Sequence, residues 1–89
     1  MSMKSRIAER LTSGLEPIRL DIVDESDLHA GHSGARDGGE THFRVLVVSP
    51  AFEGRSKVQR HRMVYSLLAA EFADGVHALA LQTLTPGES

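Results

Sequence analysis

Residues 43–48 read Phe-Arg-Val-Leu-Val-Val and are followed by Ser49-Pro50, and this short apolar run decides the fold. Five of its six residues are apolar, which is typical of a strand that is buried on both faces or lies in the middle of a sheet. Pro50 ends the strand because proline has no amide hydrogen to donate to a neighbouring strand. Residues 51–54 are expected to form a turn.

Two further strands are predicted around this one. Ile18, Leu20 and Ile22 alternate with charged residues, and a period of two indicates a half-buried strand that begins at Ile18. A second alternation, of leucine with alanine, predicts a third strand from His77 to Thr85.

The first fifteen residues are predicted to form a helix. Apolar residues recur at every fourth position from Met3 to Leu15, which places them on one helical face. Ser2 or Ser5 is expected to cap the start, and Gly14 is expected to mark the end.

A second helix is expected from about Ser56 to Phe72, and Asp74-Gly75 stops it. The following residues form its apolar stripe: Val58, Met63 or Val64, Leu67, Leu68 and Phe72. Three polar residues are expected to lie off the stripe, namely Gln59, Arg60 and Arg62.

The predicted order is therefore α-β-β-α-β, an α+β fold in which helices pack on one face of a three-stranded sheet. A length of 89 residues fits a single domain over residues 1–89, since a second core would need roughly 50 more residues. Residues 24–40 form a polar, glycine-rich loop, and loops of this length are often functional.

Composition excludes several classes of protein. The chain has no cysteine, so it has no disulfide framework, no thiolate nucleophile and no all-cysteine metal site of its own. Ten basic and twelve acidic residues give a net charge of −2, which argues against a general polyanion binder. No segment is long and apolar enough to span a bilayer or to form a signal peptide, so we expect a cytoplasmic protein without membrane contact.

Enzymatic motifs are absent from the sequence. It contains no zinc-protease HExxH pattern and neither of the glycine-rich phosphate-binding patterns. No nucleophile–base arrangement or pair of carboxylates stands out, so an enzyme is the least favoured class.

Five histidines are the strongest candidates for chemistry: His29, His32, His42, His61 and His77. Most loop histidines are ordinary polar residues, and His61 is more readily explained by packing at the start of its helix. His77 differs because it begins an apolar strand. A site made of His77 and a loop histidine is one alternative from the residues alone, and unrelated polar histidines are the other.

A basic run precedes and enters the second helix, with four positive side chains in eight residues: Arg55, Lys57, Arg60 and Arg62. Cations at a helix N-terminus oppose the helix dipole, which favours an anionic partner as the reason for their presence. The alternative is a solvated face balanced by the acidic residues near the end of the first strand.

Four blocks of the sequence resemble the BolA family in order and spacing. They are Glu40-Thr41-His42-Phe43-Arg44-Val45, Phe52-Glu53-Gly54, Gln59-Arg60-His61-Arg62-Met63-Val64-Tyr65, and Val76-His77-Ala78-Leu79-Ala80-Leu81 with Thr85-Pro86. The resemblance covers residues 15–86. It implies a fold like the class II K-homology (KH) domain, although the GXXG loop of RNA-binding KH domains is missing, which argues against RNA.

The resemblance also implies a non-enzymatic partner of monothiol glutaredoxins that shares a [2Fe–2S] cluster, in iron–sulfur trafficking or iron regulation. The family's motif histidine falls on His77. Its loop ligand is cysteine in one subgroup and histidine in the other, and the histidine-loop subgroup places it on His29, with His32 as the alternative. The partner would supply the remaining ligands with glutathione, and the apo chain is expected to be a monomer.

Some family members are described as DNA-binding transcription regulators, and the basic run, from Arg55 to Arg62, is the part of this chain that suits such a role. Four phosphate contacts predict a slope near −3.6 for log affinity against log salt. A third possibility is a zinc or copper site made of His29, His32 and His77 without any partner.

Overall fold

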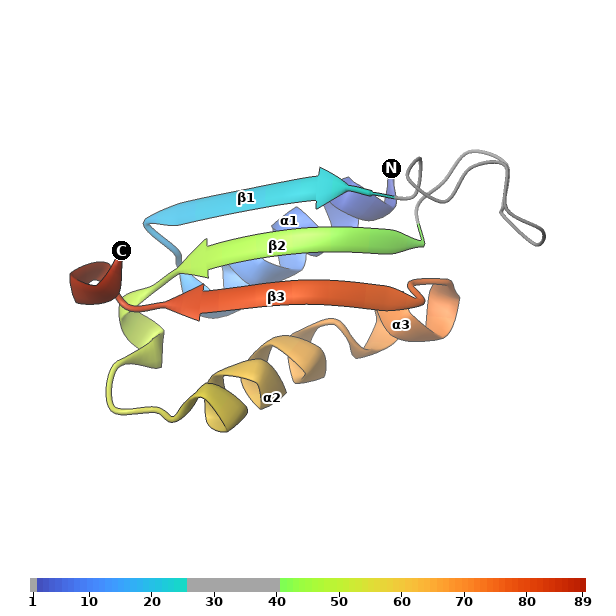
Figure 1. Ribbon diagram of the computed structural model, residues 1–89. Helices are drawn as coiled ribbons and strands as arrows, with labels where there is room; N and C mark the ends of the chain where they lie inside the picture. Colours follow the sequence, from blue (N-terminus) through green and yellow to red (C-terminus); the bar gives the residue numbers. More distant parts are fainter. Residues whose placement is uncertain (1, 26–40) are drawn as a thin grey trace.

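The elements follow the predicted order in a computed structural model that describes residues 2–25 and 41–89. The helices are α1 (Met3–Leu15), α2 (Lys57–Leu67) and α3 (Ala69–Asp74), with short 3-10 turns η2 (Pro50–Phe52) and η3 (Pro86–Glu88). The strands are β1 (Arg19–Asp24), β2 (His42–Val48) and β3 (Ala78–Leu84) (Figure 1).

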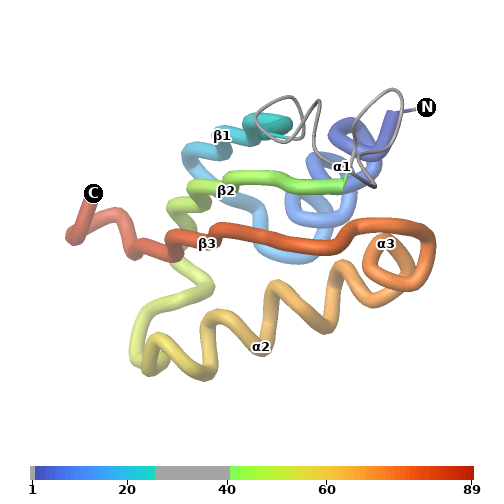
Figure 2. The backbone as a smooth tube through the Cα atoms, turned by 45° about the vertical axis from the view of Figure 1, so that its right-hand side comes forward, coloured from blue at the N-terminus to red at the C-terminus, as the bar shows by residue number. Residues whose placement is uncertain are grey.

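The three strands form one mixed sheet in the order β1-β2-β3. β1 is antiparallel to β2, and β2 is parallel to β3, so the apolar run of residues 43–48 lies in the central strand as predicted. A parallel pair requires a crossover connection, and α2 and α3 provide it along β3 (Figures 1 and 2). The register aligns Ile22, Val45 and Leu81 across the sheet.

The core lies between one face of the sheet and the helices. Phe43, Val45 and Val47 are almost completely buried on this face, and Ile7 and Leu11 of α1 pack in the same cluster. Figure 1 shows α1 behind the β1–β2 part of the sheet. The predicted α+β architecture, with helices on one face, is confirmed.

The prediction that Gly14 ends the first helix is wrong. Ser2 caps the start, where its hydroxyl accepts a hydrogen bond from the Ser5 amide, but α1 continues through Gly14 to Leu15. The helix ends at Glu16, which has a φ of 45°. A Cβ at Gly14 would lie 2.6 Å from Leu67 Cδ2, so a larger residue there would require the Leu67 side chain of α2 to move.

The segment from Ser56 to Phe72, which was expected to form one helix, is divided between the two helices α2 and α3. Ser56 caps α2 together with Gln59 in a capping box, but the helix stops at Leu67. Leu68, with φ −101° and ψ 15°, separates α2 from α3, and neither proline nor glycine marks this break. The side chain of Leu68 is buried, so its packing against the core accompanies the bend.

Strand boundaries differ slightly from the predicted ones. Ile18 precedes β1 and is 65% exposed, so the buried alternation of this strand begins only at Leu20. β3 begins one residue after His77 and ends one residue before Thr85. Within residues 2–25 and 41–89, no helix combines the length and the apolar character needed to cross a membrane.

Candidate functional site

Two histidines lie side by side where the parallel strands begin. His42 is the first residue of β2, and His77 directly precedes β3. Their ring centroids are 6.4 Å apart and the ring planes differ by 24°. His42 is one of the five candidate histidines, but its pairing with His77 could not be predicted, because only the parallel register of β2 and β3 makes the two neighbours.

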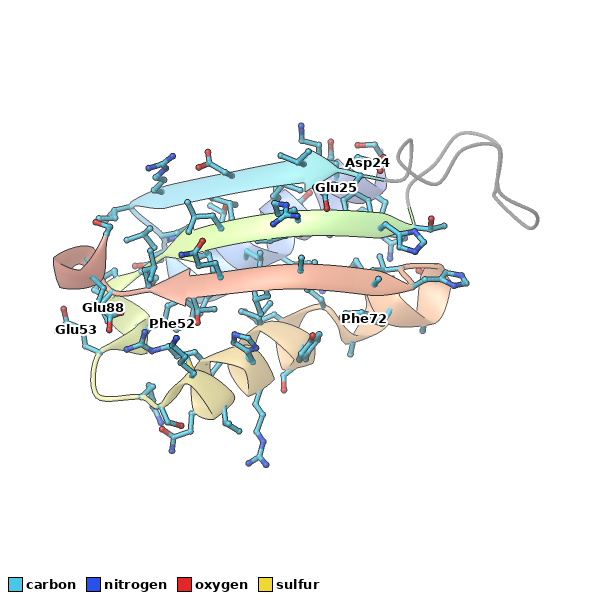
Figure 3. All side chains as sticks on the ribbon, viewed as in Figure 1. Asp24, Glu25, Phe52, Glu53, Phe72 and Glu88 are labelled. Carbon is cyan, nitrogen blue, oxygen red and sulfur yellow. The ribbon has the colours of Figure 1, made fainter. Side chains whose placement is uncertain are left out.

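The backbone fixes the position of both residues. The His77 amide donates a hydrogen bond to the Thr41 carbonyl at 2.8 Å. The Thr41 hydroxyl and His42 Nδ1 lie 2.9 Å apart, at hydrogen-bond distance. His77 is exposed and His42 is half-buried, so the outer ring is accessible to another molecule. Glu25, which is labelled in Figure 3, follows β1 at this end of the sheet.

The long polar loop starts and ends at this same edge of the sheet. At its start, the Glu25 amide donates to the His42 carbonyl at 2.8 Å, and at its end Thr41 accepts the bond from His77. The predicted loop ligands His29 and His32 lie outside the described residues. Within the part of the chain that the structure describes, no three His, Cys, Asp or Glu side chains form a group that could hold a metal ion.

One ion pair lies close to the histidines. Arg44 of β2 pairs with Glu25, with 2.9 Å between Nε and Oε2. Arg44 is mostly exposed, so this ion pair contributes little to stability.

The basic run does not form one continuous surface. Arg55, Lys57 and Arg62 are exposed, as predicted. Arg60 is only 7% exposed, so the prediction that it lies off the buried face of the helix is wrong. This residue was assigned to partner or nucleic-acid contact, but its guanidinium is used inside the protein.

Arg60 joins three parts of the chain. Its Nε donates to the Arg55 carbonyl, and its Nη1 donates to the Thr83 carbonyl and to Glu88 Oε1, the last at 2.7 Å. Its guanidinium carbon lies 6.0 Å from the centre of the Phe52 ring. Five donors in a planar fork allow arginine to bind all these acceptors at once.

A second buried charge, which the sequence analysis missed, lies between the helices. Glu71 of α3 is 1% exposed, and its Oε2 is 2.9 Å from Arg6 Nη2 and 3.4 Å from Arg10 Nε. Arg6 also pairs with Asp74 at 2.7 Å. The hydrogen bonds from Arg6 to Asp74 and Glu71 raise the pKa of this arginine.

The other carboxylate oxygen of Glu71, Oε1, is enclosed and accepts no hydrogen bond from the described residues. An unpaired buried acceptor costs about 1–3 kcal/mol. Glu71 lines a groove of about 700 Å³ between α1 and the α2–α3 pair. No sequence signal separated Glu71 from the surface glutamates. Its pairing with Arg6 and Arg10 depends on how α1 and α3 pack together, which the sequence does not show.

Comparison with known families identifies the fold. The family model described as BolA-like protein matches residues 11–88. The chain belongs to the BolA family. Both the family resemblance and the fold expected from it are confirmed.

Individual relatives agree with this membership. The chain is 51% identical over 87 residues to Protein BOLA1, chloroplastic, of Arabidopsis thaliana, a match that covers 96% of this chain and 54% of that protein. It is 45% identical over 85 residues to the DNA-binding transcriptional regulator BolA of Escherichia coli (strain K12), covering 96% of this chain and 77% of that protein.

A third relative contains the BolA domain as a smaller part. SufE-like protein 1, chloroplastic/mitochondrial, of Arabidopsis thaliana is 47% identical over 87 residues, and the match covers 93% of this chain but 24% of that protein. The solved BolA domain of SufE1 superimposes with a TM-score of 0.88 at 45% identity, covering 100% of this chain and 98% of that domain. This chain thus spans about a quarter of the first of these relatives and about half of BOLA1.

Replacing Arg60 by alanine should lower the free energy of unfolding by about 2–3 kcal/mol, because two carbonyls and Glu88 lose their buried donor. Arg62→Ala, on the exposed side of α2, is the matched control and should change it by less than about 0.5 kcal/mol. Urea denaturation measures both. Equal losses in the two variants would contradict the structural role of Arg60.

Glu88 should titrate far below an ordinary glutamate. Hydrogen bonds from Arg60 and from the Thr85 backbone lower the pKa of Glu88 from 4.5 to about 2. Because the folded pKa is the lower one, this contribution to stability is fully present above pH 4.5 and is lost as the pH falls towards 2. A carboxyl-detected NMR titration of the wild type and of Arg60→Ala measures it. A Glu88 pKa that is the same in both proteins would contradict the assignment.

Proposed function

We propose that this chain is a non-enzymatic, cytosolic partner of a monothiol glutaredoxin and shares a [2Fe–2S] cluster with it, in iron–sulfur trafficking or iron regulation. The observation that carries the proposal is the position of His77. Its exposed ring lies beside His42, at the edge of the sheet where the long loop begins and ends. Membership of the BolA family supports the same assignment.

The ligands proposed from this chain are His77 and His29, with His32 as the alternative loop ligand. Ligand exchange at such a cluster needs accessible nitrogens, and the exposed ring of His77 meets this requirement. Neutral imidazole in place of thiolate removes negative charge from the cluster and raises its reduction potential. Since the chain has no cysteine, the sulfur ligands would come from the glutaredoxin and its glutathione.

The donor set of the described residues fits shared ligation better than a closed site. Two imidazoles at one edge cannot fill the coordination of two irons, and the part of the chain that the structure describes offers no third ligand beside them. A zinc or copper site without a partner would need both His29 and His32 in addition to His77. Shared ligation needs only one loop histidine.

Reconstitution with a monothiol glutaredoxin tests the proposal by visible circular dichroism. The mixture should give a spectrum distinct from that of the glutaredoxin homodimer, and His77→Ala should abolish or alter it. His29→Ala and His32→Ala identify the loop ligand, and His42→Ala tests the ring beside His77. His61→Ala, on α2, is the matched control and should leave the spectrum unchanged. An unchanged glutaredoxin spectrum with no complex on gel filtration would reject the proposal.

A second candidate function is DNA binding, and two specific observations favour it. One relative is named a DNA-binding transcriptional regulator. Arg55, Lys57 and Arg62 are exposed around the start of α2, where backbone phosphates could reach them. Because Arg60 is buried, the expected number of contacts with DNA phosphates falls from four to three.

With three phosphate contacts, a plot of log DNA affinity against log salt concentration should have a slope near −2.7. A triple variant, Arg55→Gln, Lys57→Gln and Arg62→Gln, should reduce the slope to near zero, whereas Lys4→Gln on α1 should leave it unchanged. Fluorescence anisotropy with a labelled duplex over a salt series measures the slopes. A slope that the triple variant does not change would exclude this surface as the DNA contact.

A further inference from the structure

We propose that the groove between α1 and the α2–α3 pair binds the head group of an α-amino acid. In this site the ligand's ammonium group donates to Glu71 and its carboxylate accepts from Arg10. The groove lies in the helical layer, and its lining includes none of the described histidines and none of Arg55, Lys57 and Arg62.

The groove is large enough for a small molecule and has polar walls. Its volume is about 700 Å³, within the range of small-molecule sites. Arg6, Glu9 and Arg10 line it from α1, and Ser66, Leu67 and Glu71 line it from the opposite helices. Leu67 gives an apolar contact for an aliphatic side chain.

The anchor of the proposed site is the free oxygen of Glu71. The carboxylate is buried, and both arginines approach only Oε2. Oε1 is enclosed and accepts no hydrogen bond from residues 2–25 and 41–89. Buried polar groups are nearly always hydrogen-bonded, so this oxygen has the capacity to accept a donor from a ligand.

Charge selects the class of ligand. Arg6 and Arg10 bring two positive charges to the groove, and Glu9 and Glu71 bring two negative charges. The carboxylates would repel a simple anion, and the guanidinium groups would repel a simple cation. A zwitterion satisfies both signs without adding net charge.

Distance narrows the class to amino acids with adjacent charged groups. Arg10 Nε lies 3.4 Å from Glu71 Oε2, the oxygen beside the proposed acceptor Oε1, so the donor and the carboxylate that carries the acceptor are neighbours. The ammonium and carboxylate of an α-amino acid are joined through a single carbon, and they match this short separation. Peptides, whose two charged ends are further apart, match it less well.

Arg10 is the side chain that can open the site. It is 54% exposed and contacts Glu71 at 3.4 Å, whereas Arg6 is 28% exposed and is also held by Asp74. In the proposal, a turn of Arg10 away from Oε2 opens this contact and lets the guanidinium donate to the ligand's carboxylate while it stays beside Glu71. Arg6 would keep Glu71 paired during this change.

NMR titration of the ¹⁵N-labelled chain with L-leucine tests the proposal. The amides of Arg10, Gly14 and Glu71 should shift on addition of L-leucine. N-acetyl-L-leucine lacks the ammonium group and L-leucinamide lacks the carboxylate, so both should bind at least about 10-fold more weakly. Equal binding of either blocked compound, or no shift with L-leucine, would overturn the proposal.

Two variants assign the effect to the groove. Arg10→Gln removes the mobile guanidinium and leaves the Arg6–Glu71 pair intact, so L-leucine binding should fall at least about 10-fold. Lys4→Gln, an exposed residue of α1 outside the groove, should bind as the wild type does. Glu71→Gln should also lose binding if its circular dichroism spectrum shows it to be folded. If Arg10→Gln binds as tightly as Lys4→Gln, the site is not the one proposed.

Discussion

The parallel pairing of β2 with β3 is the constraint on which the rest of the structure depends. Two neighbouring strands that run in the same direction cannot be joined by a tight turn, so the chain must return along the sheet through α2 and α3. This return places α2 and α3 on the face that α1 also covers, and no helix within residues 2–25 and 41–89 covers the other face (Figures 1 and 2). It also brings the beginnings of the two strands together, which is why His42 and His77 are neighbours.

The crossover is held at its two ends by buried charges. Near its start, Arg60 binds carbonyls of the preceding turn and of β3, and near its end Glu71 binds the arginines of α1. Replacing such groups by apolar residues is often neutral, but removing one partner leaves an uncompensated buried charge. Both groups connect the crossover to a different element, so they specify where the helices lie.

The sequence predicted what local periodicity determines and missed what packing determines. The apolar run of residues 43–48 predicted a strand that is buried on both faces or central, and four-residue spacing predicted α1. Arg60 was misplaced because a basic side chain normally favours solvent, and only the carbonyls and Glu88 brought by β3 and η3 make its burial favourable. Gly14 was assigned to a helix end because nothing in the sequence shows that Leu67 crosses at that position.

The candidate site was predicted only in part, for the same reason. His77 was identified from its position at a strand start and from the family motif, whereas His42 became visible only with the strand register. At this edge the Arg44–Glu25 pair carries no net charge. The ligation proposed above therefore rests on the imidazole rings and not on this ion pair. Under the proposed function, His77 would be the ligand whose place the fold determines, because its backbone amide is hydrogen-bonded to the Thr41 carbonyl.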